Sequence, residues 1–372
     1  MSAPLTARAL GRALLARQHL LQRSTLDAAA MVRHLVGLQA QAAPEPPYLG
    51  LLSRIEGFAP EQLTALLEDR GAVRIALQRG TIHLVTADDC LILRPLLQPV
   101  LDRGLRTTYA KRLPGLDLTD PADPAGDLAA LAARARPLVE AEPLTFQQLG
   151  PLLAPAYPGS DPAALAQAAR CALPLVQVPP RGLWGRGGPA AHTTAEHWLG
   201  RPLDPAPALD GLVLRYLAAF GPATAADVQK WSGLTRLGPV LTRLGDRLVR
   251  LRDAQGRTLY DLPEAPRPDA SAPAPVRLLA PFDNLLLSHA DRTRVLPEEY
   301  RPRVMTVNGI VLGTVLVDGS VAGSWKTEED VLTVRPFAPL PRAALAGVEQ
   351  EGARVLALGG TPDGRVVVLP AE

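Results

Sequence analysis

The sequence predicts a mixed α+β chain in which three groups of helices each end in a strand hairpin, before a strand-rich C-terminal segment. Helical periodicity followed by alternating apolar and polar residues recurs three times before residue 263. After residue 300, Asn308-Gly309 and Asp318-Gly319 separate strands expected at 304–307, 310–317 and 321–325, and these dipeptides favour hairpin turns. Helices followed by a hairpin form a winged helix, a helix-turn-helix variant.

These patterns predict four domains. Three tandem winged-helix domains are expected at 1–113, 114–204 and 205–265, and a small, all-β C-terminal domain resembling a β-barrel at 276–372. The Pro-rich stretch 263–275 would link the last two.

The clearest of the three groups spans residues 209–262. A helix is expected at 209–220, and Thr224 with Asp227 predicts a capping box that starts a second helix. A third helix at 234–244 would follow, and then a hairpin over 248–262.

The other two groups are less regular. In the middle group, helices are expected at 127–141, from 145 and at 161–173, with the wing within 175–184. In the first group, Ser24 and Asp27 suggest a capping box for one of three helices. The elements expected there are helices at 5–14, 24–38 and 61–69 and strands at 73–77 and 81–85.

Composition excludes some classes of protein and favours none strongly. The 372 residues carry a net charge of +2, too small to indicate a nucleic-acid binder, although residues 1–113 and 210–262 each hold a basic surplus that could bind phosphate. No apolar run reaches membrane-spanning length, and arginines interrupt the N-terminal helix, unlike a signal peptide. A cytoplasmic, nucleoid-associated protein is therefore expected. Cys90 and Cys171 are far apart and are expected to be buried core thiols.

Gln39 and Gln41 are the first candidates for chemistry. They lie just before Pro44, Pro46 and Pro47, which make an extended backbone the expected conformation. Residues i and i+2 of an extended segment project to the same side, so two carboxamides could hold one water molecule. The alternative is a polar helix end with capping amides, and spacing alone favours that alternative.

A second candidate is the hairpin around Arg79, where Thr81 and His83 project to one face. This pair could orient a catalytic group or contact phosphate. A histidine in such a place more often closes a hydrogen-bond network, and that alternative stays open.

Other motifs offer less. His192 and His197 lack the i, i+4 spacing of a zinc-protease helix. The glycines at 182–188 lack the strand-to-helix setting of a phosphate cradle. Asp291 and Arg292 are expected to pair with each other as a structural support. No metal or cofactor is expected.

Three motifs together resemble one known family. They are Val36-Gly37-Leu38-Gln39-Ala40-Gln41, Arg79-Gly80-Thr81-Ile82-His83-Leu84, and Pro281-Phe282-Asp283-Asn284-Leu285-Leu286-Leu287 with Asp291-Arg292. In this order they resemble the winged-helix DNA glycosylases, and most of all the AlkZ-like (azinomycin-resistance) alkylpurine DNA glycosylases. The resemblance extends over nearly the whole chain. Each motif is weak by itself.

The resemblance implies catalytic roles for Gln39 and Gln41, and supporting or DNA-contacting roles for Thr81 and His83, with Arg79 beside them. A sister branch of the family carries Asp at the second position of the catalytic motif, so Gln41 implies the AlkZ-like branch. The expected function is a monofunctional DNA glycosylase that acts as a monomer on double-stranded DNA with N7-alkylated purines. Unhooking of interstrand crosslinks and resistance to a genotoxic natural product would extend that function. The absence of lysines near the motifs argues against a Schiff-base lyase.

Two other functions remain open at this stage. A non-catalytic winged-helix transcriptional regulator would bind a short operator and release no base. A structural scaffold would show no salt-dependent DNA affinity.

Overall fold

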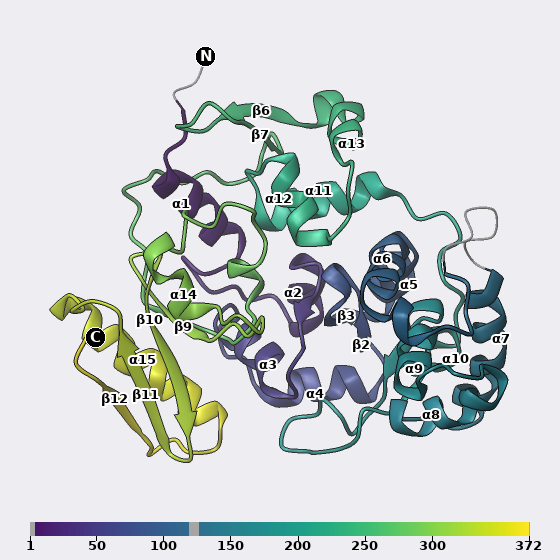
Figure 1. Cartoon of the computed structure of the whole chain (residues 1–372). Helices are drawn as coiled ribbons and strands as arrows, with labels where there is room; N and C mark the ends of the chain where they lie inside the picture. Colours follow the sequence, from purple (N-terminus) through teal and green to yellow (C-terminus); the bar gives the residue numbers. More distant parts are fainter. Residues whose placement is uncertain (1–3, 119–125, 372) are drawn as a thin grey trace. The chain divides into compact units, whose positions relative to one another are not determined.

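The computed structural model describes residues 4–118 and 126–371 and has a mixed α+β fold (Figure 1). The chain forms two compact units. The first comprises Met1–Leu63, Leu209–Trp231 and Thr235–Glu372, and the second comprises Thr64–Ala208 with Ser232–Leu234. The four-domain division of the sequence stays a prediction. In the described part of the chain, every helix is too short or too polar to cross a bilayer.

The first unit begins with two capped helices. Helix α1 (Ala7–Arg17) starts at Thr6, whose side chain accepts a hydrogen bond from the backbone of Ala9. Helix α2 (Ala28–His34) starts at Asp27, whose carboxylate accepts from Ala30 N at 2.7 Å. The helix predicted at 24–38 is therefore too long at both ends, since the backbone turns sharply at residues 36–37.

Strand β1 (Leu38–Gln39) and helices α3 (Glu45–Leu52) and α4 (Pro60–Glu68) follow. Prolines at the start of α3 occupy its first turn, where the missing N–H removes no helical hydrogen bond. They therefore begin a helix and do not prolong the extended segment that the sequence predicted.

The segment from residue 209 to 261 has the predicted order of three helices and a hairpin. Ring contacts among Tyr216, Phe220 and Trp231, with centroids 5.0–5.8 Å apart, form its core. The third helix starts at Gly238, later than the expected 234, because the backbone turns at Arg236, where φ is +59°. The elements are α11 (Leu209–Phe220), α12 (Ala225–Ser232), α13 (Gly238–Arg243), β6 (Val249–Arg252) and β7 (Thr258–Asp261).

The C-terminal part is a five-stranded sheet in the order β12-β11-β10-β9-β8. Neighbouring strands are antiparallel except β11 and β12, which are parallel. The outer strands β12 and β8 are not paired with each other, so no closed barrel is found within the described residues. The strands are β8 (Arg277–Leu279), β9 (Gly313–Val317), β10 (Ser320–Glu328), β11 (Val331–Pro336) and β12 (Arg365–Val368).

The prediction that 276–372 is all-β was wrong. Helix α15 (Arg342–Leu358) links β11 to β12 and packs against β8, β11 and β12 (Figure 1). Parallel neighbours need such a crossover, since a tight turn joins only antiparallel strands. The strand expected at 304–307 is also absent from the structure, because residues Arg301–Val304 form helix α14.

In the second unit, four strands run in the order β3-β2-β4-β5, and each adjacent pair is antiparallel. The hairpin of β2 (Ala72–Ala76) and β3 (Ile82–Thr86) confirms the one predicted there. The wing expected within 175–184 was wrong, because β4 (Leu175–Gln177) pairs with β2 and with the later strand β5 (His192–Thr194).

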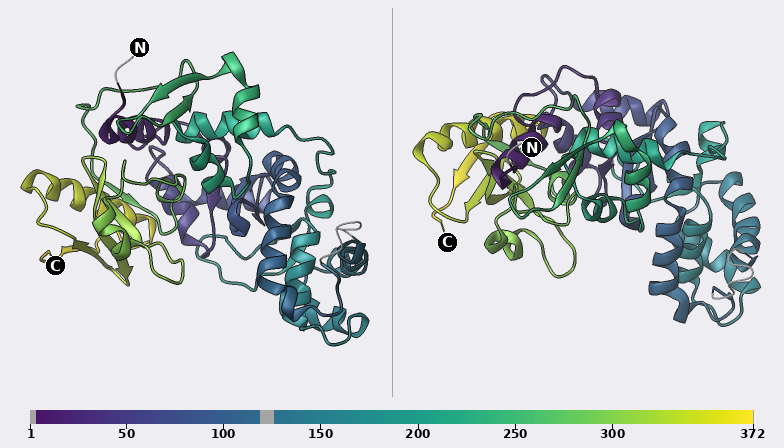
Figure 2. Two further views of the ribbon diagram at one scale, coloured as in Figure 1. Left: turned by 45° about the horizontal axis from the view of Figure 1, so that its top comes forward. Right: turned by 90° about the horizontal axis from the view of Figure 1, so that it is seen from above.

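Helices α6, α7, α8 and α9 of this unit lie side by side (Figure 2). The side chains of Thr145 and Gln148 form a capping box at the start of α8, so this predicted helix start is confirmed. The helices are α5 (Ala87–Leu96), α6 (Gln98–Tyr109), α7 (Gly126–Ala141), α8 (Phe146–Leu153), α9 (Pro162–Ala172) and α10 (Ala195–Leu199).

Candidate active site

The backbone just before the candidate glutamines forms a left-handed turn at the end of α2. Gly37 N donates to Val32 O at 3.0 Å and Val36 N donates to Arg33 O at 3.2 Å, which is the hydrogen-bond pattern of a Schellman motif. Val36 holds the left-handed position, with φ at +55°, and Gly37 follows with φ at +95°. Glycine normally takes the first of these positions, and a β-branched residue there is strained. The surrounding structure must therefore hold this turn in place.

The two candidate glutamines differ in exposure. Gln39 ends β1 and is buried, with 7% of its surface exposed, whereas Gln41 is exposed in the bend that follows. The extended backbone predicted for the pair is found at Gln39 and does not continue as a strand through Gln41. Gln39 therefore packs inside the fold, whereas Gln41 lies at the surface.

Two consecutive side chains from another part of the first unit reach the segment that contains these glutamines. Asn284 Nδ2 donates to Gly37 O at 3.2 Å. Asp283 forms two hydrogen bonds of 2.8 Å with the guanidinium of Arg54, just after α3. Both side chains are buried. Asn284 contacts the chain before the Gln39-Ala40-Gln41 segment, and Asp283 contacts the chain after it. Asp283 and Asn284 belong to the third motif of the family resemblance, but the sequence predicts no role for them.

Arg54 is buried and hydrogen-bonded on several sides. Nη1 donates to Gly50 O and to Ser53 Oγ, both at 3.0 Å, and Nη2 donates to Gln18 Oε1 at 3.1 Å. With the two bonds to Asp283, the guanidinium fixes the end of α3. A lone arginine in the apolar run Gly50-Leu51-Leu52-Ser53-Arg54-Ile55 was the available sequence signal for a buried ion pair.

In the second unit, the structure brings Thr81, His83 and Arg79 together around one turn. Thr81 Oγ1 donates to Gln78 O at 3.1 Å and closes the turn. His83 Nδ1 lies 3.0 Å from Thr81 O, and because a carbonyl only accepts, Nδ1 carries the hydrogen. Nε2 then accepts from Arg79 Nη2 at 3.5 Å. His83 therefore fixes the Arg79 side chain.

Burial keeps the His83 ring in its neutral form near pH 7. Burial, helped by the charge of Arg79, lowers the pKa of His83 to about 3. Its ring is fully buried, whereas Arg79 and Thr81 are partly exposed. Of these three residues, Arg79 is the one that carries a permanent charge at a partly exposed position.

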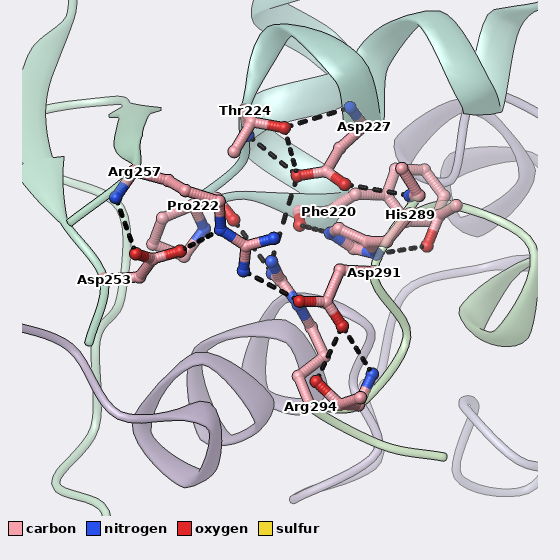
Figure 3. A network of polar contacts seen from close by, with 12 residues as sticks. Phe220, Pro222, Thr224, Asp227, Asp253, Arg257, His289, Asp291 and Arg294 are labelled. Carbon is pink, nitrogen blue, oxygen red and sulfur yellow. Dashed lines mark hydrogen bonds and ion pairs between the residues drawn. The ribbon is translucent and has the colours of Figure 1, made fainter. Parts of the chain in front are cut away.

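A separate polar network lies around the start of α12 in the first unit (Figure 3). The capping box predicted for Thr224 and Asp227 is confirmed, with Thr224 N donating to Asp227 Oδ2 at 2.8 Å and Asp227 N donating to Thr224 Oγ1 at 3.2 Å. Asp227 also accepts from Ala290 N at 2.9 Å. The network thus ties α12 to the segment around residue 290.

His289 and Asp291 complete this network. His289 Nε2 donates to Phe220 O at 3.1 Å, and burial and the charge of Arg294 lower the pKa of His289 to about 3. Asp291 binds Arg257 at 2.8 Å, so the pairing predicted between Asp291 and Arg292 was wrong (Figure 3). These contacts support the fold, and Arg257 and Asp291 remain partly exposed.

The remaining candidate motifs have packing roles. His192 stacks on Phe146 with ring centroids 4.2 Å apart. A Cβ at Gly182 would lie 2.6 Å from Arg74 Cδ, so this glycine allows close packing. Cys90 and Cys171 are buried, as predicted. Among residues 4–118 and 126–371, no group of three or more His, Cys, Asp or Glu side chains is arranged to hold a metal ion.

Comparisons with known proteins point to one family. The family described as "DNA glycosylase AlkZ-like" matches residues 32–358. The curated protein named "Interstrand DNA cross-link repair glycosylase" from Streptomyces sahachiroi is 33% identical over 176 residues, which cover 43% of this chain and 45% of that protein. The aligned part thus spans less than half of that relative. The solved structure of Streptomyces sahachiroi DNA glycosylase AlkZ has the same fold, with a TM-score of 0.75, 22% identity, and coverage of 99% of this chain and 100% of that one.

Proposed function

The chain belongs to the AlkZ-like DNA glycosylase family, and on that basis we propose that it hydrolyses the N-glycosidic bond of N7-alkylated purines in double-stranded DNA. The observation that carries the proposal is the Gln39-Ala40-Gln41 segment at the end of β1, with one amide buried and the next exposed. The segment lies within the residues that match the family.

The proposed reaction needs little acid–base catalysis. Alkylation at N7 gives the purine a positive charge, so the bond from C1′ to N9 breaks with its electron pair moving to the base, which leaves as a neutral molecule. A water oxygen then bonds to C1′ and loses its proton to solvent. The enzyme's main task is to place that water against the developing positive charge on the sugar.

Two neutral amides suit this task. Carboxamide oxygens accept hydrogen bonds from water, and their NH2 groups can bond elsewhere at the same time. We assign the holding of the water to Gln39, whose burial restricts its motion. Gln41, which is exposed, would meet the substrate and complete the water's hydrogen bonds. Because neither amide is charged, turnover would depend on the cationic leaving group.

The Arg79 turn has a proposed role in binding DNA. Arg79 would contact a phosphate, and Thr81 and His83 would support the turn from below. The hydrogen bonds of Thr81 to Gln78 O and of His83 to both Thr81 O and Arg79 favour this division of roles.

We also propose the domain arrangement of three winged helices at 1–113, 114–204 and 205–265, followed by the C-terminal domain at 276–372. The order of α11, α12, α13, β6 and β7 supports the third of these. We propose further that the protein acts as a monomer of 39.5 kDa at the nucleoid. Three winged helices in one chain could surround a duplex without a second copy, whereas regulators usually read paired half-sites as dimers.

The proposed enzyme has no lyase activity. A lyase forms a Schiff base through an amine, and the chain has only three lysines: Lys111, Lys230 and Lys326. The motif residues of the proposed site include none of them. Borohydride should therefore trap no covalent complex with damaged DNA.

A base-release assay tests the function. The protein is incubated with a duplex that contains one N7-methylguanine, and in parallel with an undamaged duplex and a duplex with an N7-linked interstrand crosslink. We expect free methylguanine, an alkali-labile abasic site, and no strand break before alkali treatment. Release at the spontaneous rate, together with tight binding of one undamaged sequence, would support the regulator instead. Loss of the crosslink would extend the substrate range to that of the named relative.

A further inference from the structure

Asp283 and Asn284 lie next to each other at the start of the short 3-10 helix η5 (Asn284–Leu286) and contact the same chain segment at two places. Asn284 contacts Gly37, two residues before Gln39. Asp283 contacts Arg54, which follows α3. We propose that Asn284 is a positioning residue for Gln39 and Gln41, and that Asp283 secures the far end of the same segment through Arg54.

The backbone before Gln39 needs an external contact to stay fixed. Val36 holds a left-handed conformation that strains a β-branched residue, and such strain persists only where neighbouring groups over-determine the conformation. The helix end supplies two hydrogen bonds to this turn through the N–H groups of Val36 and Gly37. The carbonyl of Gly37 accepts a hydrogen bond from Asn284 Nδ2 at 3.2 Å. This contact orients the peptide plane from which β1 begins.

Burial makes the contact a stable constraint. Asn284 is 3% exposed and Asp283 is 4% exposed, so water competes little for their hydrogen bonds. Asp283 also accepts from Leu285 N at 2.9 Å, which fixes η5 itself. The Asp283 side chain is therefore held by the element that bears it.

The far end of the segment is equally constrained. The Arg54 guanidinium joins Asp283, the last turn of α3 and Gln18 of the region after α1. A Cβ added to Gly50 on α3 would lie 3.5 Å from Leu38 Cδ2, so α3 packs directly against β1. Movement at either anchor would therefore shift Gln39 and its neighbours. Misplacement by about 1 Å is enough to slow an oriented reaction roughly a hundredfold.

The inference rests on the proposed catalytic role of the glutamines, and the experiment separates the two. Asn284→Asp is nearly isosteric and removes the donor to Gly37 O, and Asn284→Ala removes the whole amide. Ser288→Ala is the matched control, because Ser288 is buried in the same segment and bonds Leu285 O and His289 but not residues 36–41. Each protein is assayed for thermal unfolding, DNA dissociation constant and single-turnover release of N7-methylguanine.

We expect both Asn284 variants to release base roughly tenfold to a hundredfold more slowly, with the DNA dissociation constant changed less than about twofold. Ser288→Ala should keep the wild-type rate at a similar loss of thermal stability. Hydrogen exchange should become faster in the peptide covering residues 35–43 of the Asn284 variants alone. If the rate falls only in proportion to thermal stability, or if exchange at 35–43 is unchanged, Asn284 has no positioning role.

A second comparison separates the inference from the function on which it rests. In the Gln39→Ala/Gln41→Ala background, Asn284→Ala should lower the remaining rate by less than about twofold, because it acts through the two amides already removed. If the Gln39→Ala/Gln41→Ala protein is as active as wild type, the proposed catalytic role fails, and so does this inference. If that protein is slow and Asn284→Ala slows it further by its full factor, only the inference fails.

Discussion

Loss of the buried ion pair between Arg54 and Asp283 should destabilise the protein far more than loss of an exposed pair. Both side chains are 1% exposed, and two hydrogen bonds of 2.8 Å join them. Asp283→Asn keeps the shape and leaves a buried guanidinium without its counter-charge. Removing one partner of a buried pair costs about 3–5 kcal/mol. Gly50 O, Ser53 Oγ and Gln18 Oε1 remain as acceptors, so we expect the lower end, about 3 kcal/mol.

Urea unfolding followed by circular dichroism measures this loss, with Glu298→Gln as the matched control. Glu298 pairs with Arg301 at 3.0 Å, but the two side chains are 66% and 51% exposed, so that change should cost less than about 1 kcal/mol. The double variant Arg54→Met/Asp283→Leu should be more stable than Asp283→Asn, because it leaves no buried charge. Equal, small losses for Asp283→Asn and Glu298→Gln would refute the reasoning.

Three further outcomes follow from burial and close packing. Burial lowers the pKa values of His83, His192 and His289 to about 3, about 4 and about 3. The unfolded chain therefore binds protons below about pH 6.5 that the folded chain does not yet bind, and the free energy of unfolding should fall between pH 7.5 and pH 5 by roughly 2 kcal/mol for each of these histidines. A flat pH series in urea titrations would contradict this. Cys90 and Cys171 should not react with a thiol reagent until the protein unfolds, because burial raises the pKa values of both thiols, that of Cys90 to about 12. Rapid labelling of either thiol in the folded protein would contradict this. Gly182→Ala should cost about 1–3 kcal/mol through its contact with Arg74 and its φ of +93°, which strains a side chain. Gly187→Ala, with no atom within 4 Å of the new Cβ and no positive φ, should be nearly neutral, and equal melting temperatures would refute this.

Local signals in the sequence predicted much of the secondary structure. The capping residues of α8 and α12 and the hairpin of β2 and β3 are determined by side chains within a few residues, so short windows contain the necessary information. The crossover through α15 to the parallel strand β12 was missed because pairing of distant strands leaves no local pattern.

The same distinction explains what was predicted of the candidate site. Gln39 and Gln41 were found by their motif, but the extended backbone that the prolines predicted ends at Gln39, because the prolines start α3. The contact from Asn284 to Gly37 joins residues 247 positions apart, which no periodicity reveals. The left-handed conformation of Val36 could not be predicted either, since glycine at the next position was the expected place for such a turn.

The central claim, that Gln39 and Gln41 place the attacking water, is tested most directly by single-turnover release of N7-methylguanine from a duplex. The proteins compared are wild type, Gln39→Ala, Gln41→Ala and Gln350→Ala, which changes an exposed glutamine on α15. We predict that the two motif variants bind the duplex like wild type but release base at least roughly a hundredfold more slowly, while Gln350→Ala is unaffected. Release at the wild-type rate by both motif variants would contradict the account.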